Sequence, residues 1–214
     1  MYKKPIIRLS RYKNALYRFK SLGLVRIFSD NLADAVGATA VQVRKDFSFF
    51  GITGNKRGGY LIEDLLSKVN EILGKDKITK VIVVGAGHLG SALMNYKGFP
   101  QLGIQIAAGF DIDPVKINRK APIPIFPLDE LRDFIRTHTI KVAVIAVPDI
   151  AAQQVFNIMI SEGITGIVNF APLRLKTDKK CAVHNVNLGL ELETIIYFAN
   201  ALEKENHEDG HFKS

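Results

Sequence analysis

The stretch Lys80-Val-Ile-Val-Val-Gly85-Ala-Gly-His-Leu-Gly90-Ser-Ala-Leu decides how most of this chain folds. Its apolar residues predict a buried strand, the three glycines a tight turn, and the residues that follow a helix. In this strand–turn–helix order, the G-x-G-x-x-G pattern indicates a dinucleotide site. Gly85 permits the turn, Gly87 lets the backbone approach a pyrophosphate, and Gly90 lets the helix pack close to the strand.

An acidic residue completes the pattern. The next predicted strand, residues 104–110, is followed by Asp111, which lies 21 residues after Gly90. A carboxylate there hydrogen-bonds the ribose hydroxyls and repels a 2′-phosphate, so the sequence predicts NAD(H) rather than NADP(H) as the ligand. Asp113 is a rival for this role, and Asp111 is preferred because it is closer to the strand end.

Apolar runs and helical stretches continue to alternate along residues 76–187, which predicts a Rossmann-type parallel α/β domain. Further strands are expected near residues 141–147 and 166–169. Ligands bind outside the carboxyl ends of such strands, so the residues after them are expected to border the nicotinamide half. The predicted cofactor residues, besides the three glycines and Asp111, are Ala86, His88, Leu89, Tyr96, Pro148, Asn169, Phe170, Ala171 and Pro172.

The excess positive charge lies entirely in the first third of the chain. Residues 1–75 hold 14 Lys and Arg against 6 Asp and Glu, whereas residues 76–214 hold 15 of each, so the net charge of +8 belongs to the first segment. Such asymmetry indicates a nucleic acid or another anionic surface as partner. Charge alone does not exclude a basic domain that is merely soluble.

The same segment has the pattern of a winged helix-turn-helix domain. Tyr12, Leu16, Phe19 and Leu22 predict a first helix, Ser29 is expected to cap a second, and Thr39 a third that runs to about Phe50, with the break at Gly37. Residues 51–60 predict a β-hairpin, or wing, with cations at its tip. An amphipathic helix follows at residues 65–73, and a linker at residues 74–77.

The third helix has an apolar side and a polar, cationic side. Ala40, Val43, Phe47 and Phe50 cluster on the first, and Gln42, Arg44, Lys45 and Ser48 on the second. Gln reads adenine and Arg or Lys reads guanine in a major groove. Asp46 is expected to pair structurally. The predicted DNA contacts are Thr39, Gln42, Arg44, Lys45, Ser48, Lys56, Arg57, Gly58 and Tyr60. Taken alone, Arg44 and Lys45 would indicate only a solvated helix face.

The last helix, residues 188–206, is apolar on more than one face and precedes a polar tail, residues 207–214. Such a helix needs burial on several sides. Packing on its own domain is one solution. Insertion into a second copy is another, because helix-turn-helix proteins usually bind paired half-sites as dimers.

Several classes of function are disfavoured. We find no Ser/His/Asp set, metal cluster or paired catalytic carboxylates, and a dehydrogenase needs an acid or base beside the nicotinamide. This favours a sensor over an enzyme. The alternatives are an NAD-dependent dehydrogenase with an accessory basic domain, and a DNA-binding protein whose Rossmann domain has lost its ligand. The single cysteine, Cys181, and the lack of a long apolar run predict a cytoplasmic protein without membrane spans.

Together these features resemble the Rex family of redox-sensing transcriptional repressors along nearly the whole chain. The resemblance is carried by Val43–Gly51, the segment Gly54–Tyr60, Gly85–Tyr96, and Asn169–Pro172 with the last helix. It implies a homodimer with swapped C-terminal helices that binds operator DNA. It also implies that NAD+ permits DNA binding, whereas NADH releases the DNA.

The resemblance further implies a switch. In the family, an arginine near the N-terminus pairs with an aspartate just before the last helix, or a tyrosine after the glycine motif takes that aspartate. Arg8 and Tyr96 match this pattern, but the aspartate position is Asn187. Because a bond to a neutral acceptor is weaker than a charge-assisted pair, we expect the switch to be wired differently here.

Overall fold

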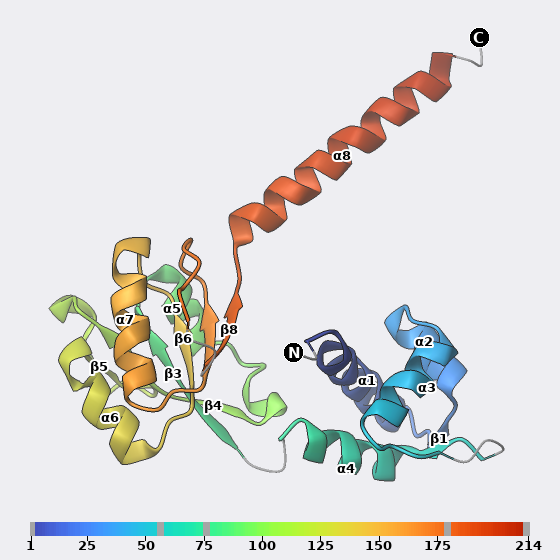
Figure 1. Ribbon diagram of the computed structural model, residues 1–214, viewed down its shortest axis with the longest axis horizontal. Coiled ribbons are helices and arrows are strands. Elements are labelled where there is room, and N and C mark those ends of the chain that lie inside the picture. Colours follow the sequence, from blue (N-terminus) through green and yellow to red (C-terminus); the bar gives the residue numbers. More distant parts are fainter. Residues whose placement is uncertain (1–2, 55–57, 75–77, 178–180, 212–214) are drawn as a thin grey trace. The chain divides into compact units, whose positions relative to one another are not determined.

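The structure, a computed structural model, describes residues 3–54, 58–74, 78–177 and 181–211, with side chains from residue 4 to residue 203 within these ranges (Figure 1). The chain divides into two compact units, Met1–Ile78 and Thr79–Ser214. Each has its own hydrophobic core.

The first unit is mainly helical. Its core is formed by buried side chains of all four helices and of Ile27 and Ile52, as the predicted apolar periodicity requires. The elements are α1 (Lys3–Ser21), β1 (Arg26–Ile27), α2 (Ser29–Val36), α3 (Ala40–Phe49), β2 (Tyr60–Leu61) and α4 (Ile62–Ile72).

The predicted helix-turn-helix corresponds to α2 and α3. Gly37 ends α2 with a left-handed backbone (φ 65°), and Thr39 caps α3 by accepting a hydrogen bond from the Gln42 N–H at 3.1 Å. The predicted cap at Ser29 is wrong, because Ser29 is the first residue of α2 itself. The preceding N–H, that of Phe28, instead donates to the Asn31 side chain.

The predicted hairpin within residues 51–60 is also wrong in its pairing. Tyr60 pairs with Ile27 and Leu61 with Arg26, in an antiparallel ribbon whose two strands are far apart in sequence. Residues 52–54 form no strand. Lys56 and Arg57, predicted at the wing tip, lie outside the described residues.

The second unit is built on a six-stranded parallel sheet with strand order β5-β4-β3-β6-β7-β8, the order of a dinucleotide-binding fold. This confirms the predicted Rossmann-type fold and adds the short strand β5, which was not expected from the sequence. The strands are β3 (Thr79–Val84), β4 (Ile104–Asp111), β5 (Ile125–Pro127), β6 (Val142–Ile145), β7 (Gly166–Asn169) and β8 (Ala182–Asn185).

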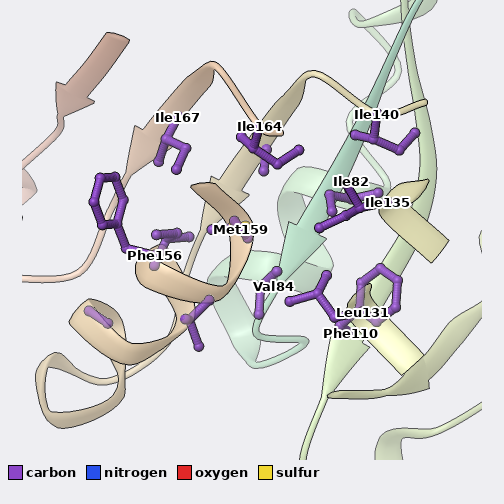
Figure 2. Packing of buried hydrophobic residues seen from close by; sticks show 14 of the residues in the cluster. Ile82, Val84, Phe110, Leu131, Ile135, Ile140, Phe156, Met159, Ile164 and Ile167 are labelled. Atoms are coloured by element: carbon purple, nitrogen blue, oxygen red, sulfur yellow. The ribbon is translucent and has the colours of Figure 1, made fainter. Parts of the chain in front are cut away.

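Helices cover both faces of this sheet (Figure 1). On one face, α6 (Leu131–His138) and α7 (Asp149–Ser161) bury their apolar sides against β3, β4, β6 and β7, as Figure 2 shows for Ile82, Val84, Leu131, Phe156 and Met159. On the other face lies α5 (His88–Met94), whose Met94 packs with Val81 and Val83. This packing on both faces fixes the carboxyl ends of β3, β4 and β6 relative to one another.

The unit ends in α8 (Leu188–His211). Its large apolar side chains are each between 55% and 70% exposed, namely Leu188, Leu190, Leu192, Ile195, Ile196, Tyr197, Phe198 and Leu202. No helix in the described part of the chain is long and apolar enough to span a membrane.

Candidate functional site

The glycine turn has the geometry that its sequence requires. Gly85 has a left-handed backbone (φ 98°), and a Cβ added to it would collide with the Ala146 carbonyl. A Cβ on Gly90 would collide with the Gly85 carbonyl, so the helix can approach β3 only without a side chain here. A Cβ on Gly87 would meet no protein atom within 4 Å. Gly87 therefore leaves open space beside the turn, as the close approach of a pyrophosphate would require.

Asp111 is buried at the end of β4 and is held in place by backbone donors. Its Oδ2 accepts from the Ala86 N–H at 2.7 Å, and its Oδ1 from the Asp113 N–H at 2.9 Å. Burial alone would raise the pKa of Asp111, but these bonds and the nearby Lys116 ammonium lower it below its ordinary value. The carboxylate is therefore ionised at neutral pH.

The sequence did not indicate Lys116 as a site residue. Its Nζ lies 3.4 Å from Asp111 Oδ2 and 3.7 Å from Asp113 Oδ2, on the short turn Pro114–Lys116. Asp113, the rival acid, caps that turn by accepting from the Val115 N–H. The only signal available from sequence was a lysine five residues after the strand-end acid.

These residues line one pocket at the carboxyl ends of β3, β4 and β6. It has a volume of about 500 Å³, which is within the range of small-molecule sites. The predicted residues Gly85, Gly87, Asp111 and Pro148 line it. Its other lining residues are Val84, Ile112, Asp113, Lys116, Leu128, Ala146, Val147, Ala151 and Val155. The predicted Ala86 is buried, His88 and Leu89 are exposed, and none of the three lines the pocket.

The predicted loop after β7 lies outside this pocket. Asn169 is fully buried, and its Nδ2 lies within hydrogen-bonding distance of the carbonyls of Ala171 and Leu173 and of Asn185 Oδ1. Its Oδ1 accepts from the Ala171 N–H. The amide therefore fixes the shape of the loop. Phe170 is half-buried, Ala171 is buried and Pro172 is exposed.

The first unit presents a polar groove beside α3, with Arg44 and Asp30 among its lining residues. It has a volume of about 790 Å³ and brings together Arg44 and Ser48 of α3 with Tyr60 of β2. Lys45 and Thr39 are also exposed on α3, and Gln42 is half-buried. The Gly58 carbonyl accepts a hydrogen bond from Arg26 Nη1 at 2.7 Å. Residues of α3 and of the segment before β2 therefore line the same surface. This is the arrangement that a protein needs in order to bind in a major groove of DNA.

Arg8 is paired inside this unit. Its Nε and Nη2 each donate to the buried carboxylate of Asp46 at 2.6 Å. The expected structural pairing of Asp46 is confirmed. At the other predicted switch position, Asn187 Oδ1 accepts from the Leu190 N–H and so caps α8. Tyr96 is 58% exposed and packs edge-on against Phe99. Arg8 and Asn187 therefore each have a partner within their own unit.

The described residues hold no group of three or more His, Cys, Asp or Glu that is placed to bind a metal ion.

Two family models match consecutive parts of the chain. Residues 3–48 match a model described as "Putative DNA-binding protein N-terminus", and residues 76–173 match one described as "CoA binding domain". The first match lies within the first unit, and the second begins at residue 76, three residues before the second unit starts at Thr79.

Curated relatives match over nearly the full length. The redox-sensing transcriptional repressor Rex of Desulforamulus reducens is 38% identical over 94% of this chain and 95% of that protein. The Rex protein of Clostridium botulinum is 39% identical over 90% of this chain and 92% of its own.

Solved structures are also similar to this chain over nearly its full length. A crystal structure of RSP in complex with β-NAD+ and operator DNA has a TM-score of 0.88 at 32% identity, covering 98% of this chain and 97% of that one. RSP in complex with β-NADH has a TM-score of 0.82. Likeness of this extent along almost the whole sequence shows that the chain belongs to the Rex family of redox-sensing transcriptional repressors.

Proposed function

We propose that this protein represses transcription by binding operator DNA through its first unit, and that it releases the DNA when its second unit binds NADH. The observation that carries this function is that one chain has both a helix, α3, with Arg44 and Lys45 exposed beside a groove, and a glycine-turn pocket lined by Asp111. The solved relative RSP, which was crystallised with NAD+ and operator DNA and with NADH, supports the same two ligands.

In the second unit, the backbone of Gly85–Gly90 receives the pyrophosphate, and Asp111 receives the adenosine ribose hydroxyls. Pro148 and the loop Asn169–Pro172 border the nicotinamide half. Because the Asn169 amide is bonded to its own loop, we assign this side chain the role of shaping the site. The dinucleotide acts here as an effector, in keeping with relatives that are repressors.

In the first unit, Arg44, Lys45 and Ser48 contact base edges or phosphates, with Thr39 and Tyr60 at the border of the groove. Lys56, Arg57 and Gly58, in the segment that precedes β2 in the sequence, contact phosphate. A homodimer joined through α8 sets two copies of α3 on the two half-sites, about 34 Å apart along the duplex. Such a repressor acts in the cytoplasm, where the chain meets both DNA and the NADH pool.

The test begins with operator selection. The full-length protein with NAD+ is used to capture sequences from a pool of random 30-base-pair duplexes, and the affinity for the selected duplex is then measured with NAD+, NADH or coenzyme A. We expect NADH to weaken DNA binding by about 5- to 150-fold, the usual range of coupling between sites. Coenzyme A should leave DNA affinity unchanged. Equal affinity with saturating NADH and NAD+ would contradict the proposal.

A further inference from the structure

A buried carboxylate on α3 connects the first helix of the chain to the reading helix. Asp46 is 3% exposed and accepts four hydrogen bonds. Two come from Arg8 at 2.6 Å each, one from the Tyr12 hydroxyl at 2.8 Å, and one from the Gln42 side-chain amide at 2.9 Å. Arg8 and Tyr12 belong to α1, so the carboxylate holds both helices to each other.

The charge on Asp46 is stable at neutral pH. Burial alone would raise the pKa of Asp46, but the hydrogen bonds from Arg8, Tyr12 and Gln42 outweigh burial and lower it. Burial and the bond to this carboxylate raise the pKa of Tyr12 to about 12, so the phenol keeps its proton and remains a donor. Asp46 is therefore a permanent acceptor at this point of α3.

A permanent acceptor fixes the orientation of the neighbouring amide. Gln42 lies one helical turn before Asp46, and its Nε2 donates to Asp46 Oδ1. The reversed amide would place the carbonyl oxygen of Gln42 against the carboxylate, where the two negative atoms repel. An amide that has donated once retains one N–H and its carbonyl, and these are the groups that form the two hydrogen bonds to adenine in a major groove.

The position of Gln42 suits this task. It is the third residue of α3, and residues at the start of a recognition helix contact base edges. Arg44 and Lys45, both exposed, follow two and three positions after it. The network thus connects a fixed hydrogen-bonding pattern to the part of the helix that enters the groove.

We propose that Arg8, Tyr12 and Asp46 are positioning residues that set the side-chain amide of Gln42 to read one adenine in each operator half-site. The inference rests on the proposed DNA-binding function and adds a determinant of sequence specificity to it. If the network only stabilised the fold, its loss would weaken DNA binding equally for all sequences and would leave the base preference unchanged.

The experiment compares full-length variants by their base preference. Gln42→Ala, Asp46→Asn and Arg8→Gln are each used, with NAD+, to select from the random duplex pool. Each variant is then titrated with the wild-type operator and with that operator changed at single positions. For each variant, the affinities for the wild-type and the changed operator are measured with the same protein preparation, and their ratio is taken. Inactive protein in the preparation affects both affinities equally and does not change this ratio. The matched control is Lys20→Gln, which removes the exposed Lys20–Glu63 ion pair of the same unit.

We expect wild type and Lys20→Gln to prefer adenine at one position of each half-site by about tenfold, the discrimination of one bidentate contact. Gln42→Ala should lose this preference, and Asp46→Asn and Arg8→Gln should lose part of it, with preferences elsewhere unchanged. The inference would be overturned if Gln42→Ala kept every preference, or if Asp46→Asn and Arg8→Gln weakened all sequences alike. Failure of the wild type to select any sequence would instead overturn the proposed function, and this inference with it.

Discussion

At the scale of single residues, Asp111 combines a structural contact with the ligand-binding role proposed for it. The pattern assigns it to the ribose of the dinucleotide. The structure adds that its Oδ2 accepts from the Ala86 N–H, inside the glycine turn. The carboxylate therefore also holds the glycine turn in place, while Lys116 offsets part of its charge.

These two functions are separable by substitution. Asp111→Ala removes both, and because hydrogen bonds to charged groups contribute about 1.5–3 kcal/mol each, we expect NADH affinity to fall at least tenfold. Asp111→Asn keeps an oxygen for the Ala86 N–H but loses the charge that repels a 2′-phosphate. It should bind NADH more tightly than Asp111→Ala does and should discriminate less against NADPH. Fluorescence titration measures both affinities.

The control for these variants is Asp113→Ala, which removes a carboxylate that caps the neighbouring turn and is 41% exposed. It should change NADH affinity little. DNA affinity without NADH should be unchanged in all three variants. A well-folded Asp111→Ala protein that no longer bound DNA would refute the division of labour between the two units.

At the scale of elements, α8 is rich in large apolar side chains, yet these side chains are exposed. Its eight large apolar side chains are more than half exposed, although monomeric proteins rarely expose large apolar patches. Burial of each would stabilise a contact by about 1.5–3 kcal/mol. A second copy of the chain is the partner that the proposed dimer supplies.

We predict that charge on this helix separates the dimer. The double variant Ile195→Glu, Phe198→Glu should weaken association at least about 100-fold, since two large apolar contacts are lost and two charges are desolvated. Sedimentation equilibrium should then report the monomer mass of 23.7 kDa at concentrations where wild type is dimeric. Glu193→Gln, on the same helix, should leave the dimer intact. A double variant that stays dimeric would show that α8 is not the interface.

At the scale of the whole molecule, each unit has its own core and its own candidate ligand. If NADH weakens DNA binding, linkage requires that operator DNA weaken NADH binding by the same factor. The expected switch through Arg8 and Asn187 would have to break the bidentate pair of Arg8 with Asp46, in exchange for a weaker bond to a neutral amide. The coupling is therefore not expected to depend on that contact.

Reciprocity gives the prediction at this scale. NADH affinity measured by fluorescence should fall in the presence of saturating operator by the factor that NADH imposes on operator affinity. A random duplex of equal length is the control and should have a smaller effect. Unequal factors, measured at equilibrium in the same buffer, would mean that the two ligands do not act through one shared equilibrium.

The sequence by itself determined the local features of this protein. Short-range sterics and hydrogen bonding determine the glycine turn, the strand before it, the acid at the end of β4 and the cap at Thr39. The residues next to each feature in the sequence were therefore sufficient to predict it. The confinement of positive charge to the first unit is likewise a property of composition.

Tertiary structure decided what depends on residues distant along the chain. The ribbon pairs Tyr60 with Ile27, not with the adjacent segment, because burial of Ile27 in the helical core brings β1 to β2. Asp46 binds Arg8 from 38 positions away, since α1 and α3 pack around one core. Local patterns carry no signal for such contacts, which arise from the packing of whole elements.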